Sequence, residues 1–174
     1  MYRTVLSLVS LLTLFFSLSA SAAEPKLQGY GAFSSLNKDW MLMALYSEPA
    51  SELSESVLQR LEIKVAPKKI SPRRFRQLWL ETLGVEHNAA TMAAMQVELE
   101  QFFNIVQGSL KRGDTLIIER TASDGLVVTD VQLNYHNLAQ LSENFLDVLV
   151  QGLVGKHPPT QALKTGLMGQ QSLR

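Results

Sequence analysis

The order of strand-type and helix-type patterns along the chain limits the fold more than any other feature of the sequence. Strand-like segments come first, two helical patterns follow, further strand-like segments come next, and two more helical patterns close the chain. Strands and helices that are grouped in this way, rather than alternating one by one, are typical of α+β proteins. The sequence therefore predicts one α+β domain, an antiparallel β-sheet with helices layered on one face.

The first group of strands is predicted from its apolar patterns. Residues 40–46 are a continuous apolar run whose length favours a buried strand over a short helix. Residues 60–66 alternate apolar and charged side chains, which is the pattern of a half-buried strand. Upstream of both, Gly29 and Gly31 suit a turn or a close approach of another backbone.

The first pair of helices is predicted from capping residues and apolar spacing. Ser71 and Pro72 fit the N-cap and the first helical position, and Gly84 is expected to end the helix. A second helix is predicted over residues 89–106. Its apolar stripe is expected to belong to the core: Met92, Met95, Leu99, Phe102, Phe103 and Val106.

The second group of strands contains a strong hairpin signal. Asp124-Gly125 lies between the β-rich segments 115–119 and 126–131, and such a pair between two strands favours a tight turn. Residues 133–138 are predicted to form a third short strand. These segments complete the strands of the expected sheet.

The last two helices are again predicted from their caps. Ser142 is expected to cap a helix over residues 143–153 that Gly155 ends. Thr160 is expected to cap a short final helix that ends at Leu167. Residues 170–174 then form a frayed tail.

The N-terminus has the three parts of a secretory signal peptide. Arg3 gives the positive start, residues 5–18 are apolar and uncharged, and residues 20–23 are small. We expect cleavage after Ala22 or Ala23, which leaves residues 24–169 as a single domain. The chain has no cysteine, so export without disulfides is expected, and the bacterial periplasm is the favoured compartment.

The charge of the chain is balanced, with 16 basic and 16 acidic residues. A balanced surface predicts no general attraction for nucleic acid or for an anionic membrane, and no stable membrane anchor is expected after cleavage. One basic cluster stands out: Lys68, Lys69, Arg73, Arg74 and Arg76. It fits either the solvated start of a helix or an anion-binding patch.

The residues that could carry chemistry are few. His87, His136 and His157 have no partner at the spacing of a metal site. No nucleophile elbow is found, and Gly29-x-Gly31 lacks the strand–helix context of a dinucleotide loop. The sequence therefore predicts no catalytic residue, no metal site and no cofactor.

Several short motifs, taken in order, resemble those of the bacterial chalcone isomerase-like family, in its exported branch. The resemblance covers nearly all of the predicted mature chain. Its motifs are Gly29-x-Gly31, Ala44-Leu45-Tyr46, Arg60-Leu61-Glu62-Ile63, Lys111-x-Gly113-Asp114, and segments 145–149, 152–159 and 163–169. The resemblance implies a cleft between sheet and helices, which holds a flavonoid in the plant enzymes and a fatty acid in related binding proteins.

The same resemblance implies where the site residues fall. In the enzymes an Arg holds the anionic oxygen of the substrate and a Thr organises a water, and these positions fall on Phe33 and Met41 of this chain. Neither side chain can stabilise an oxyanion. The other candidates for the ligand cleft are Tyr30, Tyr46 and Arg60.

Three hypotheses follow. The first is a non-catalytic periplasmic protein that binds a small apolar or amphipathic ligand, such as a fatty acid, in the cleft. The second is an isomerase or intramolecular lyase that uses other residues, such as Tyr30, Tyr46, Lys38 or Arg60. The third is a protein of the cell envelope whose helices form an interaction face.

Overall fold

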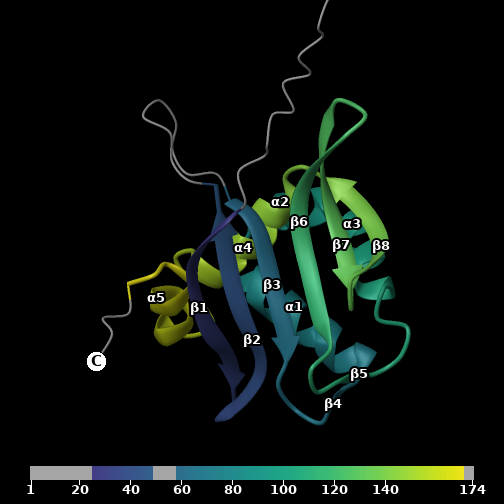
Figure 1. The fold of residues 1–174 in the computed structure, drawn as a ribbon. Coiled ribbons are helices and arrows are strands. Elements are labelled where there is room, and N and C mark those ends of the chain that lie inside the picture. Colours follow the sequence, from purple (N-terminus) through teal and green to yellow (C-terminus); the bar gives the residue numbers. More distant parts are fainter. Residues whose placement is uncertain (1–24, 49–57, 171–174) are drawn as a thin grey trace, which may run out of the picture.

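A computed structural model describes residues 25–48 and 58–170, in which an antiparallel sheet is backed by helices (Figure 1). Six strands lie in the order β1-β2-β3-β6-β7-β8, and each neighbouring pair is antiparallel. These strands are β1 (Lys26–Ser35), β2 (Lys38–Ser47), β3 (Leu58–Val65), β6 (Thr115–Ser123), β7 (Leu126–Leu133) and β8 (His136–Ser142). The predicted signal peptide with its cleavage site lies outside the described residues.

The helices lie on one face of the sheet, behind it in the view of Figure 1. They are α1 (Pro72–Glu86), α2 (Ala89–Ala94), α3 (Gln96–Asn104), α4 (Phe145–Val154) and α5 (Gln161–Leu167). A separate two-stranded ladder joins β4 (Lys69–Ile70) to β5 (Leu110–Lys111) at one end of the molecule. The α+β prediction, an antiparallel sheet with helices layered on one face, is therefore confirmed. None of the helices in the described ranges is long and apolar enough to cross a membrane.

The core lies between the sheet and the helices. In β3, Leu61, Ile63 and Val65 are buried toward the helices, as their alternation predicts. On the helix side, the ring of Phe102 is the centre of an aromatic cluster. Its centroid lies 5.6 Å from that of Phe75, 5.8 Å from that of Trp79 and 5.5 Å from that of Phe145. The predicted apolar stripe of residues 92–106 thus belongs to the core.

Two glycines of β1 let α5 pack directly against that strand. A Cβ atom at Gly29 would collide with the carbonyl oxygen of Gly166, and one at Gly31 would lie 3.1 Å from a Cδ atom of Leu163. Any side chain at Gly29 would push α5 away, so this position requires glycine. Of the two roles predicted for this pair, the close backbone approach is the one observed.

Two helix starts and one hairpin turn were predicted from local signals and are confirmed. The Ser71 hydroxyl accepts a hydrogen bond from the backbone N–H of Arg74 at 3.2 Å, with Pro72 at the first helical position. The Thr160 hydroxyl accepts one from the backbone N–H of Leu163 at 3.1 Å. The Asp124-Gly125 turn also forms, with φ angles of 51° and 78°.

Other helix boundaries were predicted wrongly. Gly84 does not end α1, which continues to Glu86, because the glycine faces open space and the helix can run past it. The helix predicted over residues 89–106 is split at Met95, whose φ of −91° and ψ of 1° end α2. A second helix, α3, then begins at Gln96 and contacts β8.

Ser142 is not the cap of a helix but the last residue of β8, and the third strand lies later than the predicted 133–138. Asn134 and Tyr135 form the turn before it, both with positive φ. The backbone N–H and the hydroxyl of Ser142 donate to the Glu98 carboxylate at 2.6 and 2.9 Å. Glu98 of α3 thereby occupies the outer edge of the sheet.

Candidate functional site

A cleft of about 500 Å³ opens between the tip of the β1–β2 hairpin, α1 and the segment that joins α4 to α5. Phe33 of β1 and Leu78 of α1, both buried, form its apolar floor. Val85 and Pro158 extend this apolar surface toward the mouth. The cleft lies between sheet and helices, where the family resemblance places the ligand.

Most polar groups that line the cleft already serve the fold. The Thr82 hydroxyl donates to the carbonyl of Leu78 at 2.8 Å, and the Thr160 hydroxyl caps α5. The Ser34 hydroxyl donates to Asp39 at 2.5 Å. These hydroxyls therefore already have hydrogen-bond partners within the fold.

Glu86 fixes the chain beside the cleft. Its carboxylate accepts hydrogen bonds from the backbone N–H groups of Lys156 at 3.0 Å and His157 at 2.8 Å, and the His157 Nδ1 lies 3.4 Å from it. These two backbone hydrogen bonds, with a smaller contribution from the nearby His157 ring, lower the pKa of Glu86 below its ordinary value. The side chain of Glu86 is only 4% exposed, so it acts as a buried clamp on the segment that carries His157.

The charge of the cleft does not favour an anion. Among the described residues that line it, none is Lys or Arg, and Glu81 is its acidic residue. Ser35 and Asn37 lie at the mouth, and no hydrogen bond joins either side chain to another described residue. The mouth therefore offers neutral hydrogen-bonding groups above an apolar floor.

The five residues predicted to line the cleft do not come together. Phe33 lines it, and Met41 is buried opposite Phe33 in the β1–β2 pair without reaching the cavity. Tyr30, Tyr46 and Arg60 lie on the other face of the sheet, away from the helices. The outward position of Arg60 could have been predicted from the sequence, because side chains alternate along a strand and its neighbour Leu61 is buried.

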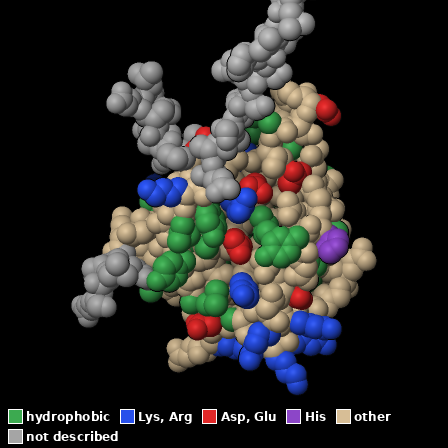
Figure 2. Space-filling view, in the orientation of Figure 1, with side chains coloured by type: hydrophobic (Ala, Val, Ile, Leu, Met, Phe, Trp, Pro, Cys, Tyr) green, Lys and Arg blue, Asp and Glu red, His purple; other side chains and the backbone are tan. Residues whose placement is uncertain are grey.

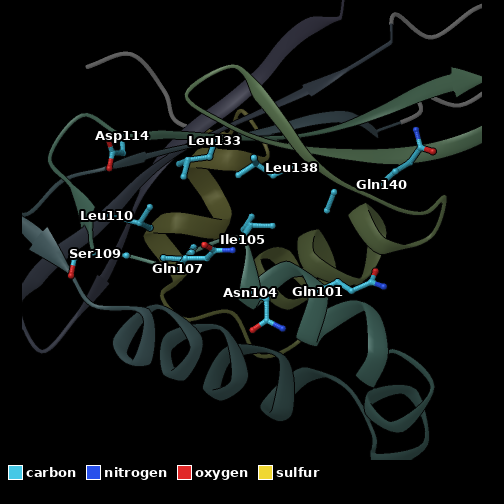
Figure 3. A pocket seen from close by; sticks show the side chains of 13 residues that line it. Gln101, Asn104, Ile105, Gln107, Ser109, Leu110, Asp114, Leu133, Leu138 and Gln140 are labelled. Carbon is cyan, nitrogen blue, oxygen red and sulfur yellow. The ribbon is translucent and has the colours of Figure 1, made fainter.

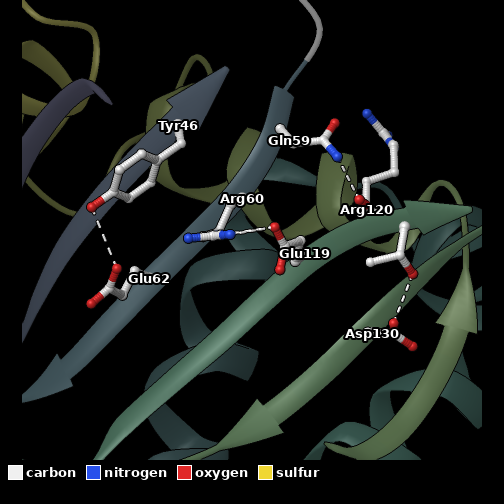
Figure 4. Close-up of polar contacts among 8 residues, drawn as sticks. Tyr46, Gln59, Arg60, Glu62, Glu119, Arg120 and Asp130 are labelled. Carbon is white, nitrogen blue, oxygen red and sulfur yellow. Dashed lines mark hydrogen bonds and ion pairs between the residues drawn. The ribbon is translucent and has the colours of Figure 1, made fainter. Parts of the chain in front are cut away.

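On the outer face of the sheet, charged and polar side chains pair with one another (Figure 4). The Arg60 guanidinium donates to Glu119 at 2.5 and 3.0 Å, and the Tyr46 hydroxyl donates to Glu62 at 3.4 Å. Partial burial and the neighbouring Glu62 raise the pKa of Tyr46. Arg60 is therefore already neutralised by a carboxylate and is poorly placed to receive that of a ligand.

A second, larger hollow of about 790 Å³ lies on the helix side of the sheet at its other edge, between α3 and the strands β7 and β8 (Figure 3). Ile105 and Leu110 form its floor with Leu133, and the side-chain amides of Gln101 and Gln140 lie at its rim. None of the five candidate residues lines it. Size alone would favour this hollow, but the position of the family site favours the cleft beside Phe33.

Local sequence signals did not identify most of the residues that line the cleft. Leu78 and Thr82 belong to a helix predicted only as core, and Pro158 was predicted only as a break. The described ranges contain no group of three or more His, Cys, Asp or Glu side chains that could hold a metal ion.

Comparisons with known proteins identify a family and a related fold. A family model described as chalcone isomerase-like matches residues 14–169. The crystal structure of a fatty-acid binding protein from Arabidopsis thaliana superposes with a TM-score of 0.63 at 14% identity, over 85% of this chain and 88% of that chain. A search of curated proteins gives no match. The structural likeness, at this identity, establishes a shared fold.

Proposed function

This chain belongs to the chalcone isomerase-like family, and we propose that it is a non-catalytic member that binds a small apolar or amphipathic molecule in the cleft beside Phe33. The observation that carries the proposal is the place of Phe33 on the floor of the cleft, where the family resemblance expects an Arg. An apolar floor favours an alkyl or aromatic group and gives nothing to an oxyanion.

The size and lining of the cleft support this proposal. Ligand pockets in proteins commonly measure roughly 300–1,000 Å³ and are mostly apolar with a few polar groups. The cleft, at about 500 Å³, lies within that range. The protein from Arabidopsis that shares the fold is described as a fatty-acid binding protein, and this supports an alkyl ligand here.

The absence of Lys and Arg from the described lining bears on the head group of the ligand. A carboxylate placed there would lose water without gaining a cation, which is unfavourable. A hydroxyl or ester could bond to Ser35 or Asn37 at the mouth. We therefore expect a neutral head group to bind at least as well as a carboxylate on the same alkyl chain.

The proposal is tested with two series of ligands matched in chain length, fatty acids and fatty alcohols. Binding is measured as the rise that each ligand causes in the melting temperature of the protein. Affinity should rise about fourfold for each added CH₂ until the cleft is full, because each buried CH₂ contributes roughly 0.8 kcal/mol. Val85→Glu would place a charge at the mouth and should weaken binding. Val97→Glu, at a similarly exposed position of α3 outside the cleft, is the matched control.

Two outcomes would contradict the proposal. No shift in melting temperature with either series would exclude binding of alkyl ligands. Cyclisation of a chalcone above its spontaneous rate would exclude the non-catalytic assignment and favour the isomerase hypothesis.

We also propose that the protein is exported to the periplasm. The support is the sequence pattern of Arg3, the apolar residues 5–18 and the small residues 20–23. Intact-mass analysis of a periplasmic fraction should give a chain that begins at Ala23 or Glu24. A full-length chain in the membrane fraction would contradict export with cleavage.

A further inference from the structure

Basic side chains gather at one end of the molecule, at the lower edge of the view in Figure 2, around β4 and β5. The sequence cluster contributes only part of them. Arg76 leaves the group because it pairs with Glu100 of α3, and the β4–β5 ladder brings in cations from a distant part of the chain. The resulting basic end consists of Lys38, Lys68, Lys69, Arg73, Arg74, Lys111 and Arg112.

Three contacts hold this basic end together. The Lys38 ammonium and the Arg74 guanidinium both lie over the Trp40 ring, at 4.2 and 4.7 Å from its centroid. The Arg112 guanidinium donates to the carbonyl of Ala66 at 3.0 Å. The β1–β2 hairpin, the β3–β4 turn, β5 and the start of α1 therefore present their cations on one surface.

The charges of the basic end are not neutralised by the fold. No ion pair in the described ranges involves any of its seven cations. Lys69 and Lys111 are direct partners in the β4–β5 ladder, an arrangement in which like charges destabilise the pair. Arg73 and Arg74 lie in the first turn of α1, where the helix dipole disfavours cations.

Two acidic residues lie near these cations, and both already accept hydrogen bonds from other groups. Asp39 accepts the hydroxyl of Ser34 at 2.5 Å. Asp114 accepts the backbone N–H of Lys111 at 2.7 Å and the side chain of Asn134 at 3.1 Å. The basic end thus keeps a large positive excess, although the whole chain is neutral.

Leu36 projects from the tip of the β1–β2 hairpin beside these cations. Its side chain is 90% exposed. Leu36 and Asn37 form a two-residue turn between the paired Ser35 and Lys38, with φ angles of 54° and 55°. Such a turn favours Asn-Gly, and a Leu with positive φ is strained. Neither burial nor turn geometry therefore accounts for this leucine.

We propose that the basic end docks on an anionic lipid bilayer, with Leu36 inserted among the acyl chains and the cations against the headgroups. Anionic headgroups above apolar chains match this arrangement of charge and apolar surface. Nucleic acid would satisfy the cations but not Leu36. The Trp40 ring beside the basic end has two cations over it rather than a free face for a base.

This docking goes beyond the proposed ligand binding and needs no ligand in the cleft. The two surfaces are nevertheless adjacent, because Ser35, Leu36 and Asn37 also line the mouth of the cleft. Docking would therefore bring that mouth to the bilayer surface. An alkyl ligand could then pass between bilayer and cleft without crossing open water.

The test uses a chain that begins at Glu24, without ligand. It keeps every helix and strand of the structure and lacks the apolar N-terminal segment, which would itself enter bilayers. Flotation with vesicles of phosphatidylcholine plus phosphatidylglycerol should show binding that added salt weakens. Vesicles of phosphatidylcholine alone should bind far less. No binding to the anionic vesicles would overturn the proposal.

Two variants separate the charge from the apolar tip. Lys69→Ala with Lys111→Ala should weaken vesicle binding about 25-fold, since each cation near an anionic surface contributes about fivefold. The matched control, Lys26→Ala with Lys156→Ala, removes two exposed charges elsewhere and should leave binding unchanged. Equal effects of both pairs would overturn a localised docking surface.

Leu36→Asn gives effects of opposite sign on folding and on docking. Asn suits the turn, so the melting temperature should rise. Vesicle binding should fall about tenfold or more, because the variant lacks the leucine side chain that docking would bury in the bilayer. Unchanged vesicle binding by this variant would overturn insertion into a bilayer. A parallel titration with heparin would in that case identify the basic end as a site for a soluble polyanion.

Discussion

Phe33 and Met41 lie directly opposite each other in the β1–β2 ladder, and both are buried toward the helices, with exposed fractions of 3% and 1%. Only Phe33 reaches the cleft, whereas Met41 belongs to the core. The two positions that the family resemblance assigns to an Arg and a Thr are therefore neighbours in space, but one lines the cavity and the other supports it.

Phe33→Ala should destabilise the fold and enlarge the cleft. Truncation of a buried Phe typically costs about 3–5 kcal/mol in the free energy of unfolding. Phe33→Leu, which keeps much of the volume, should cost under about 1.5 kcal/mol. Urea unfolding measures both, and equal stability of Phe33→Ala and the unmodified chain would show that the ring is not packed.

Trp79 offers a comparison of packing with hydrogen bonding. The side chain is 1% exposed, and its Nε1 has no hydrogen-bond partner among the described residues. Trp79→Ala should cost about 3–5 kcal/mol. Trp79→Phe should cost much less, because it keeps an aromatic ring and removes an unsatisfied donor. Thermal unfolding checks both, and an equal loss for the two variants would contradict this account.

Gly29→Ala should destabilise the protein by displacing α5, since its Cβ has no room beside Gly166. Gly84→Ala is the matched control, because it lies inside α1 and faces open space. This second variant should stabilise the protein by up to about 1 kcal/mol, since Ala favours a helix over Gly. Chemical denaturation of the two variants should therefore give changes of opposite sign.

Glu86 should make stability depend on pH in acid. Its folded-state pKa is lowered, chiefly by the hydrogen bonds from Lys156 and His157, from an ordinary value of 4.5. A lowered carboxyl pKa gives stability that is present above pH 4.5 and lost as the pH falls through the folded-state value. Glu86→Gln should weaken the dependence of the melting temperature on pH in this acid range. An unchanged slope of melting temperature against pH would contradict the role of Glu86.

Local signals predicted the fold where the interaction is local. Ser71 and Thr160 bond to a backbone N–H three residues ahead, so the sequence alone identifies them. Ser142 is also a residue that commonly caps helices, but its hydroxyl bonds to Glu98 on a helix distant in the sequence. At the break at Met95, no side-chain cap hydrogen bond marks the start of α3. Neither the long-range contact nor the uncapped helix start can be predicted from capping patterns.

The candidate site was predicted in part for the same reason. Phe33 was located from its place in the family pattern, whereas the other walls of the cleft come from α1 and from segment 157–160, which only the tertiary fold brings to β1. The sequence cluster contains four of the seven cations of the basic end, whereas Lys111 joins Lys69 only through the β4–β5 ladder. Composition gives the total charge and not its distribution.

The hydrogen bonds from Ser142 to Glu98 have a consequence for self-association. An outer strand such as β8 presents unpaired backbone groups that can template the strand of another copy, which is the first step toward polymers. At its end the carboxylate of Glu98 holds the place that a foreign carbonyl would take, and a register shift between Val131 and Gln132 further interrupts the ladder. We therefore expect the α3–β8 contact to hinder the growth of this protein into fibrils.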